Sequence, residues 1–366
     1  MSIIIFIIVL LVLVLVHEAG HFSSAKFFGI KVEEFGFGFP PKLFGIKKGE
    51  TEYTLNLLPI GGFVRIFGED PSTEEEISGP DAQRSFVNKP KWQQAVVLFA
   101  GIISNLLLAW VLFSISLMYG MPTSVENAAG YKVNNPALTI VSVITQSPAS
   151  AAGLRTGDKI VSIKNDSGMA PSVTTEAIQS YVTESAGKEV DIGYLRGNST
   201  EINTAKIFPE ESKTDHKYEI GISMDEIGTA KLSFFPALWN GLRLDWNATK
   251  QTVVGLYMLI YGAIHGKGSL SDVAGPVGMV GIVGDAMKFG FSYLLSFTAL
   301  ISINLAVINL IPFPALDGGR LLFLLIEKIK GSRIDPKIAN TVNSIGFGVL
   351  LLLMLVITYH DVIKLF

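Results

Sequence analysis

Three residues near the amino terminus have the types and the spacing of a metal-binding hydrolase site. His17 and His21 stand four positions apart, and Glu18 lies between them in the sequence His-Glu-Ala-Gly-His. On an α-helix, residues four apart differ by about 40° in rotation and ~6 Å in rise, so both imidazoles can bind one ion from the same face. The carboxylate between them then lies beside a metal-bound water, where it can act as a base.

A catalytic zinc ion also needs a third protein ligand and an open position for water. The chain has no cysteine and five histidines, so there are few candidates. The remaining histidines fall in segments that we interpret as surface: His216, His265 and His360. Asp317 is the stronger candidate, because an ionisable side chain at the end of an apolar span is costly unless it is paired or bound. The alternative is a helix-ending turn, since two glycines follow it.

Four apolar segments are long enough to cross a bilayer, which takes roughly 20 residues each. They run over residues 2–25, 94–118, 293–314 and 342–357. The chain is 49% hydrophobic and 17% charged, which favours a polytopic α-helical membrane protein. A net charge of −3 shows no excess of basic residues that would indicate nucleic-acid binding. A signal peptide is the alternative for the first segment, which lacks a basic n-region and a small-residue cleavage site.

Basic residues near the ends of the spans predict the orientation of the chain. Lysines and arginines cluster in the loops that follow the first and third segments, so we expect both loops to be cytoplasmic. The long segment between the second and third spans and both termini are then extracytoplasmic. His17 and His21 lie at the cytoplasmic end of the first span, and Asp317 lies at the cytoplasmic end of the third. The three candidate ligands are therefore expected at the same membrane depth.

The segment between the second and third spans has two parts. Residues 134–226 alternate apolar and polar side chains and predict a small α/β domain. Its expected strands are residues 138–144, 160–164, 189–195 and 201–207, with a helix at 174–183. Residues 230–290 begin with an aromatic-rich amphipathic pattern that favours an interfacial helix, or else a helix packed on the outer domain. Residues 1–120 and 291–366 then form the two membrane parts, with two spans each.

The two metal motifs resemble those of the site-2 protease family of intramembrane zinc metalloproteases. The family pairs His-Glu-x-x-His with Asn-x-x-Pro-x-Pro-x-Leu-Asp-Gly-Gly, and residues 17–21 and 309–319 match both in full. The resemblance is to its bacterial RseP/RasP-type branch. Residues 147–160 resemble a PDZ signature, with a generic small α/β domain as the alternative. Further matches are Gly36-Phe37-Gly38, Gly61-Gly62, Asn105 in the second span and residues 275–278.

The resemblance implies a role for individual residues. His17, His21 and Asp317 would bind one zinc ion per chain, and Glu18 would act as the catalytic acid–base. Asn309 matches the family residue that holds substrate or the oxyanion, with an interhelical hydrogen bond as the alternative. Five residues in strand-like segments would hold an extended substrate by β-augmentation, with an ordinary β-hairpin as the alternative: Gly36, Phe37, Gly38, Gly61 and Gly62. We interpret Asn105 and Asn304 as packing residues.

The implied function is that of an intramembrane-cleaving zinc endopeptidase in the inner membrane of a bacterium. Its substrates would be single-span proteins already trimmed outside, such as anti-sigma factors or remnant signal peptides, and the PDZ-like domain would act as a size filter. The first alternative is a PDZ-bearing membrane scaffold or quality-control receptor with an unused metal site. The second is a zinc transporter or sensor. Glu18 argues against both, because only a hydrolase needs that base.

Overall fold

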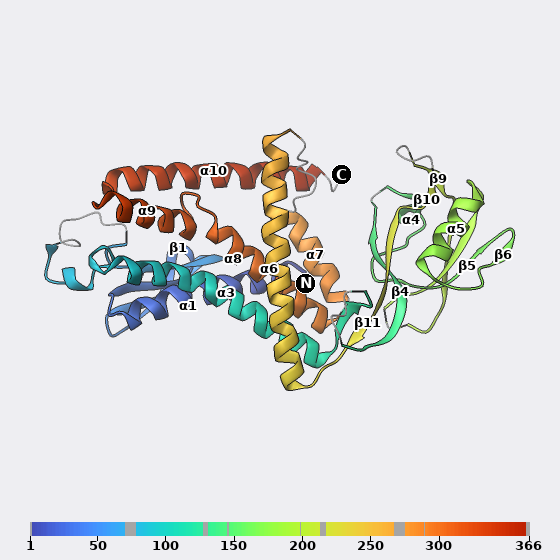
Figure 1. Cartoon of the computed structure of the whole chain (residues 1–366), viewed down its shortest axis with the longest axis horizontal. Helices are drawn as coiled ribbons and strands as arrows, with labels where there is room; N and C mark the ends of the chain where they lie inside the picture. Colours follow the sequence, from blue (N-terminus) through green and yellow to red (C-terminus); the bar gives the residue numbers. More distant parts are fainter. Residues whose placement is uncertain are drawn as a thin grey trace. The chain divides into compact units, whose positions relative to one another are not determined.

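The computed structural model describes residues 2–69, 78–126, 131–144, 146–197, 199–212, 217–266, 275–288 and 290–363 (Figure 1). His216 lies outside these residues. The chain forms two compact units. The first contains residues 1–114, 237–284 and 295–366, and the second contains residues 115–236 and 285–294.

Four helices in the described chain are long and apolar enough to cross a membrane. They are α1 (Ser2–Phe27), α3 (Lys91–Tyr119), α8 (Phe291–Leu310) and α10 (Pro336–Ile363). Each overlaps one of the predicted apolar segments, and the ends differ for local reasons. Helix α8 stops before Pro312, which has no backbone N–H and cannot continue a helix. Helix α10 begins earlier than predicted, at Pro336, because proline suits the first helical position.

Helix α1 packs closely against α3 and α8. A Cβ atom on Gly20 would lie 2.4 Å from the carbonyl oxygen of Ala100, so the backbones of α1 and α3 approach at this glycine. On α8, Ile301 joins Val9 and the fully buried Leu13 in one apolar cluster. These contacts fix the rotation of α1 and turn the face that carries its two histidines toward the protein interior.

Strands β1 (Val32–Lys48) and β2 (Thr51–Ile66) each bend, so together they form a sheet of four arms. The two inner arms run in the same direction, and each outer arm is antiparallel to its neighbour. Gly36 pairs with Phe63 on one side and with Thr54 on the other, and Thr54 also pairs with Gly45. The arms are therefore ordered 62–66, 32–37, 51–56 and 42–48. The two outermost arms of this sheet, 62–66 and 42–48, each pair with one strand only among the described residues.

The short helix α9 (Asp317–Lys330) follows α8 after a turn that contains two prolines. Three polar contacts attach this helix and its preceding turn to other parts of the first unit. They are the ion pairs Arg320–Glu69 and Lys91–Glu327 and the hydrogen bond from the backbone N–H of Ala315 to Oδ1 of Asn343. The helix is thereby joined to the segment after β2, to α3 and to α10.

Helix α6 (Phe234–Ile264) runs steeply across the direction of α3 in Figure 1. The indole N–H of Trp110 on α3 donates to the carbonyl of Leu238, and the hydroxyl of Thr252 donates to the Asn304 side chain on α8. The predicted amphipathic helix therefore packs on helices of the first unit, and the prediction of an interfacial position stays a prediction. Helix α7 (Pro276–Lys288) follows, and its Gly278 N–H donates to Asp361 near the end of α10.

The second unit is built on an antiparallel sheet with the order β3-β11-β4-β5-β7-β8. Its strands are β3 (Met121–Ser124), β4 (Val133–Val143), β5 (Lys159–Asn165), β7 (Val190–Leu195), β8 (Asn203–Ile207) and β11 (Ile222–Ala230). The minor strands are β6 (Gly168–Met169), β9 (Glu210–Glu211) and β10 (Tyr218–Glu219). The helices are α4 (Pro148–Ala151) and α5 (Thr175–Ser185). Sequence periodicity missed β3 and β11, because acidic residues and a glycine interrupt the apolar positions of β11.

The core of this unit joins the sheet to α5. Ile178 and Val182 of the helix are buried with Ile163 and Ile192 of the sheet. Burying a side chain of this size contributes roughly 1.5–3 kcal/mol relative to leaving it exposed. The predicted strands and helix therefore form one packed domain.

A buried carboxylate, paired with a partly exposed arginine, fixes the turn before β5. The carboxylate of Asp158 has 1% of its surface exposed and accepts two hydrogen bonds from the Arg196 guanidinium, at 2.8 and 2.7 Å. It also accepts the backbone N–H of Arg155 at 2.9 Å. The hydrogen bonds to Asp158 raise the pKa of Arg196, so the pair stays charged. This geometry explains why aspartate follows the turn glycine Gly157 in the PDZ-like signature.

We predict that Asp158→Ala destabilises the second unit by about 1–2 kcal/mol, because the backbone N–H of Arg155 and the partly exposed Arg196 guanidinium lose the acceptor that they share. Amide hydrogen exchange of β5 and β7 in the full chain measures this change. The control is Glu189→Ala, which breaks the exposed pair with Lys206 and is expected to cost less than about 0.5 kcal/mol. An equal loss of amide protection in both variants would contradict the stabilising role of the Asp158–Arg196 pair.

Candidate metal centre

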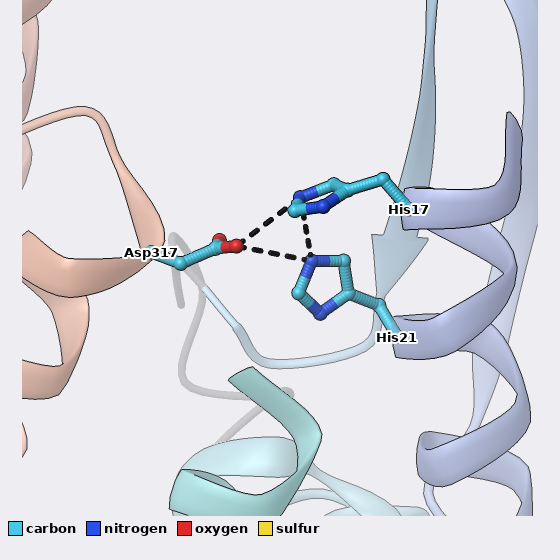
Figure 2. Close-up of side chains that lie close together, drawn as sticks. All are labelled: His17, His21 and Asp317. Carbon is cyan, nitrogen blue, oxygen red and sulfur yellow. Dashed lines mark hydrogen bonds and ion pairs between the residues drawn. The ribbon is translucent and has the colours of Figure 1, made fainter. Parts of the chain in front are cut away.

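Helix α1 presents two imidazoles on one buried face, as their spacing predicts. His17 and His21 each have 7% of their surface exposed, and their Nε2 atoms lie 3.2 Å apart. The two rings meet edge to face, with centroids 4.7 Å apart. Figure 2 shows both rings leaving α1 in the same direction.

Asp317 approaches the two imidazoles from the opposite side of the site (Figure 2). Its Oδ2 atom lies 3.2 Å from Nε2 of His17 and 3.3 Å from Nε2 of His21. The turn after α8 places it there, as the first residue of α9. Residues that are 300 positions apart in the chain are thus brought together in the first unit.

The spacing of these three atoms matches a tetrahedral metal site. Ligands about 2.05 Å from a zinc ion at tetrahedral angles lie ~3.3 Å from one another. The observed separations are 3.2, 3.2 and 3.3 Å. Asp317 Oδ2 is buried and receives no hydrogen bond from the described residues. A carboxylate oxygen and two imidazole nitrogens at such distances can bind one cation together.

Helix α3 contacts the far side of both imidazoles. Nδ1 of His21 lies 2.9 Å from the backbone carbonyl oxygen of Val97. Since a carbonyl can only accept, Nδ1 carries the proton and Nε2 directs a lone pair into the site. The side-chain amide of Asn105 lies 3.3 Å from Nδ1 of His17. Asn105 therefore does more than pack between helices, because its side chain faces a candidate ligand.

Gly101 of α3 provides the space for the imidazoles. A Cβ atom at this position would lie 2.3 Å from Nε2 of His21 and 2.9 Å from Cε1 of His17. Sequence reasoning did not assign this residue to the site. The available signal was a glycine inside an apolar helix, which costs about 1 kcal/mol relative to alanine and therefore needs a structural reason.

The turn that delivers Asp317 also depends on glycines. A Cβ atom on Gly318 would lie 2.4 Å from the Leu310 carbonyl oxygen, and one on Gly319 would lie 2.2 Å from the Phe313 carbonyl oxygen. Both glycines are buried. The Asp-Gly-Gly sequence thus lets the start of α9 pack against the end of α8, so the turn and the ligand interpretations of Asp317 are compatible.

Glu18 is partly buried on α1, next to the first histidine. Its Cγ would lie 3.8 Å from a Cβ atom on Gly62, so the outer arm 62–66 runs beside this carboxylate. Asn309 is in the last turn of α8, partly buried, and eight residues before Asp317. The roles predicted for Glu18 and Asn309 stay predictions.

The predicted substrate-binding glycines occupy different places in the sheet. Gly36 and Phe37 pair on both sides, so their backbone groups are already used within the sheet. The Gly38 carbonyl accepts the amide N–H of Asn56 at 3.0 Å. Gly62 instead begins the outer arm 62–66, and Gly61 directly precedes it. The expectation that Gly36 and Phe37 offer a free strand edge is therefore corrected, because the arm 62–66 is outermost on this side.

A buried His-His-Asp cluster with an adjoining glutamate, on helices long enough to span a membrane, defines a zinc metalloprotease of the site-2 type. The chain belongs to peptidase family M50, which its residues 5–353 match. It is 32% identical to the regulator of sigma-W protease RasP of Bacillus subtilis, with 100% of this chain and 99% of that protein covered. It is 31% identical to zinc metalloprotease RasP of Geobacillus kaustophilus, over 100% and 98%.

A proposed zinc metalloprotease of Clostridium acetobutylicum is 36% identical, over 96% of this chain and 94% of that protein. Among solved structures, the PDZ domain of an SdrC-like protein from Listeria monocytogenes matches 25% of this chain and 92% of that domain. The identity is 23% and the TM-score is 0.21. The family match and the full-length relatives confirm the predicted site-2 protease family, and with it a multi-pass membrane protein that uses zinc.

We predict that Gly101→Ala lowers zinc affinity by at least about tenfold, because the new methyl group enters the space of both imidazoles and shifts the ligand geometry. Zinc retained by the purified protein against a graded chelator measures the effect. Gly348→Ala on α10 is the matched control, since a Cβ atom there meets no atom within 4 Å. Wild-type zinc affinity in Gly101→Ala would show that the imidazoles do not need this space.

Proposed function

We propose that this protein cleaves peptide bonds within membrane-embedded segments, with one zinc ion per chain held by His17, His21 and Asp317. The observation that supports this most strongly is the set of three buried donor atoms at tetrahedral spacing, next to a glutamate. The ion would lower the pKa of a water molecule toward neutrality and polarise the substrate carbonyl. Glu18 would accept the water proton as the water attacks, then deliver it to the leaving amine nitrogen.

Burial of the site strengthens this chemistry. Electrostatic interactions are larger where water is excluded, so a preorganised donor acts strongly on a developing oxyanion. Asn309 is the candidate donor, since it is on α8, the helix that leads into the Asp317 turn. The alternative role for Asn309 is a hydrogen bond between helices, which also suits an amide in a membrane.

A transmembrane substrate must unwind before it can be cut, because its scissile carbonyl is hydrogen-bonded within its own helix. We propose that the arm 62–66 takes the unwound segment as an added strand. This arm is outermost in its sheet and runs beside Glu18. Backbone hydrogen bonds to an edge strand hold a chain extended with little demand on its sequence. Gly61 and Gly62 would allow the substrate backbone to approach closely.

The substrates would be single-span membrane proteins that another protease has already shortened. The name of the Bacillus subtilis relative links it to sigma-W regulation, so anti-sigma factors are one candidate class for this protein and remnant signal peptides are another. In this proposal the protein lies in the bacterial inner membrane. Residues 134–226 form an extracytoplasmic PDZ-like domain that limits substrate size, and both termini are also extracytoplasmic.

We expect Glu18→Gln to abolish cleavage of a tagged single-span substrate in liposomes while zinc stays bound. Glutamine keeps the shape of glutamate but cannot accept the proton. Asp317→Asn should lose activity and also lower zinc affinity, since it removes the charged ligand. Cleavage and zinc content are measured on the same preparations. Unchanged activity with Glu18→Gln would favour the scaffold or receptor alternative.

The substrate strand can be located by disulfide cross-linking, because the chain contains no cysteine. In the Glu18→Gln background, we expect Arg65→Cys to cross-link with single cysteines near the cleavage site of a bound substrate. Ile46→Cys is the matched control, because it lies on the opposite outer arm and is also exposed. Stronger cross-linking at residue 46, or equal cross-linking at both, would contradict the assigned edge.

A further inference from the structure

Asn105 is a fully buried amide in the middle of α3, and its backbone and side chain have separate partners. The backbone carbonyl oxygen accepts the hydroxyl of Ser302 on α8 at 2.8 Å. Any amino acid could supply that carbonyl, so the contact between α3 and α8 does not explain an asparagine. The side chain instead faces His17, with the amide nitrogen 3.3 Å from Nδ1.

In this orientation the hydrogen bonds of Asn105 are incomplete. Its Oδ1 atom is buried and has no hydrogen-bond partner among the described residues. The two ends of a carboxamide have nearly the same size, so a 180° rotation exchanges Oδ1 and Nδ2 without changing the packing.

The proton on the His17 ring decides which end of the amide faces it. If Nε2 of His17 directs a lone pair toward a metal, Nδ1 must carry a proton and needs an acceptor. Oδ1 of Asn105 is the acceptor within reach once the carboxamide is rotated. This hydrogen bond replaces a contact between two donors, Nδ1–H of His17 and Nδ2–H of Asn105. The Val97 carbonyl already provides the same contact for His21.

We propose that Asn105 is a positioning residue, which accepts the Nδ1 proton of His17 and thereby fixes the tautomer and ring orientation of that ligand. Helix α3 then orients both imidazoles, through one backbone carbonyl and one side-chain oxygen. This inference rests on the proposed metal site. It adds a requirement for an acceptor at position 105, where packing alone would require only a side chain of the right size.

The test compares Asn105→Leu with Asn105→Asp in the purified full-length protein. Leucine has a similar size but cannot accept, so zinc affinity in competition with a chelator should fall about 10- to 100-fold. Aspartate can only accept, so it should keep the affinity within a few-fold and keep the visible absorption bands of the cobalt-substituted protein. Asn304→Leu is the control, an amide on α8 bonded to Thr252 and away from the imidazoles.

Two results would overturn the proposal: wild-type zinc affinity in Asn105→Leu, or an equal loss in Asn105→Leu and Asn105→Asp. If the leucine variant does not fold, the zinc affinity of Asn105→Asp tests the proposal by itself, because aspartate retains the acceptor and removes the donor. A large loss of zinc affinity in that variant would then overturn the proposal. A wild-type protein that binds neither zinc nor cobalt would instead refute the proposed metal site itself.

Discussion

The meeting of one carboxylate with two imidazoles is the constraint on which the first unit depends. Burying Asp317 beside His17 and His21 places a charge and two lone pairs within 3.3 Å of one another. Buried charges are costly unless a counter-charge or a metal ion compensates for them. The turn before α9 must therefore be held firmly, and contacts from α3, α10 and the segment after β2 hold it.

Close helix packing is the second requirement, and it explains the small residues around the site. Gly20 brings the backbone of α1 against α3, and Gly101 of α3 leaves room for both imidazole rings. In a membrane, helices associate through such close contacts and interhelical hydrogen bonds rather than through the hydrophobic effect. The polar atoms of α3 that face the rings, from Val97 and Asn105, are part of the same packing. Ligand geometry and helix packing are thus two aspects of one interface.

The bent sheet gives this buried site an edge beside the candidate base. Because β1 folds between the two arms of β2, its residues 32–37 are interior, and the outer arm 62–66 lies next to α1 near Glu18. A strand edge supplies backbone donors and acceptors, which an unwound membrane helix has lost. The arrangement would therefore offer an unwound chain new hydrogen bonds close to the candidate metal ligands.

The sequence by itself determined the features that depend on local periodicity. The spacing of His17, Glu18 and His21 specifies one helix face, the apolar runs specify α1, α3, α8 and α10, and the proline and glycine residues specify a turn at Asp317. Tertiary structure decided how these pieces meet. The site contacts of Gly101 and Asn105, and the interior place of Gly36 in the sheet, depend on pairings between distant segments. Helical and strand periodicity do not encode which distant segments meet, because packing between the elements decides it.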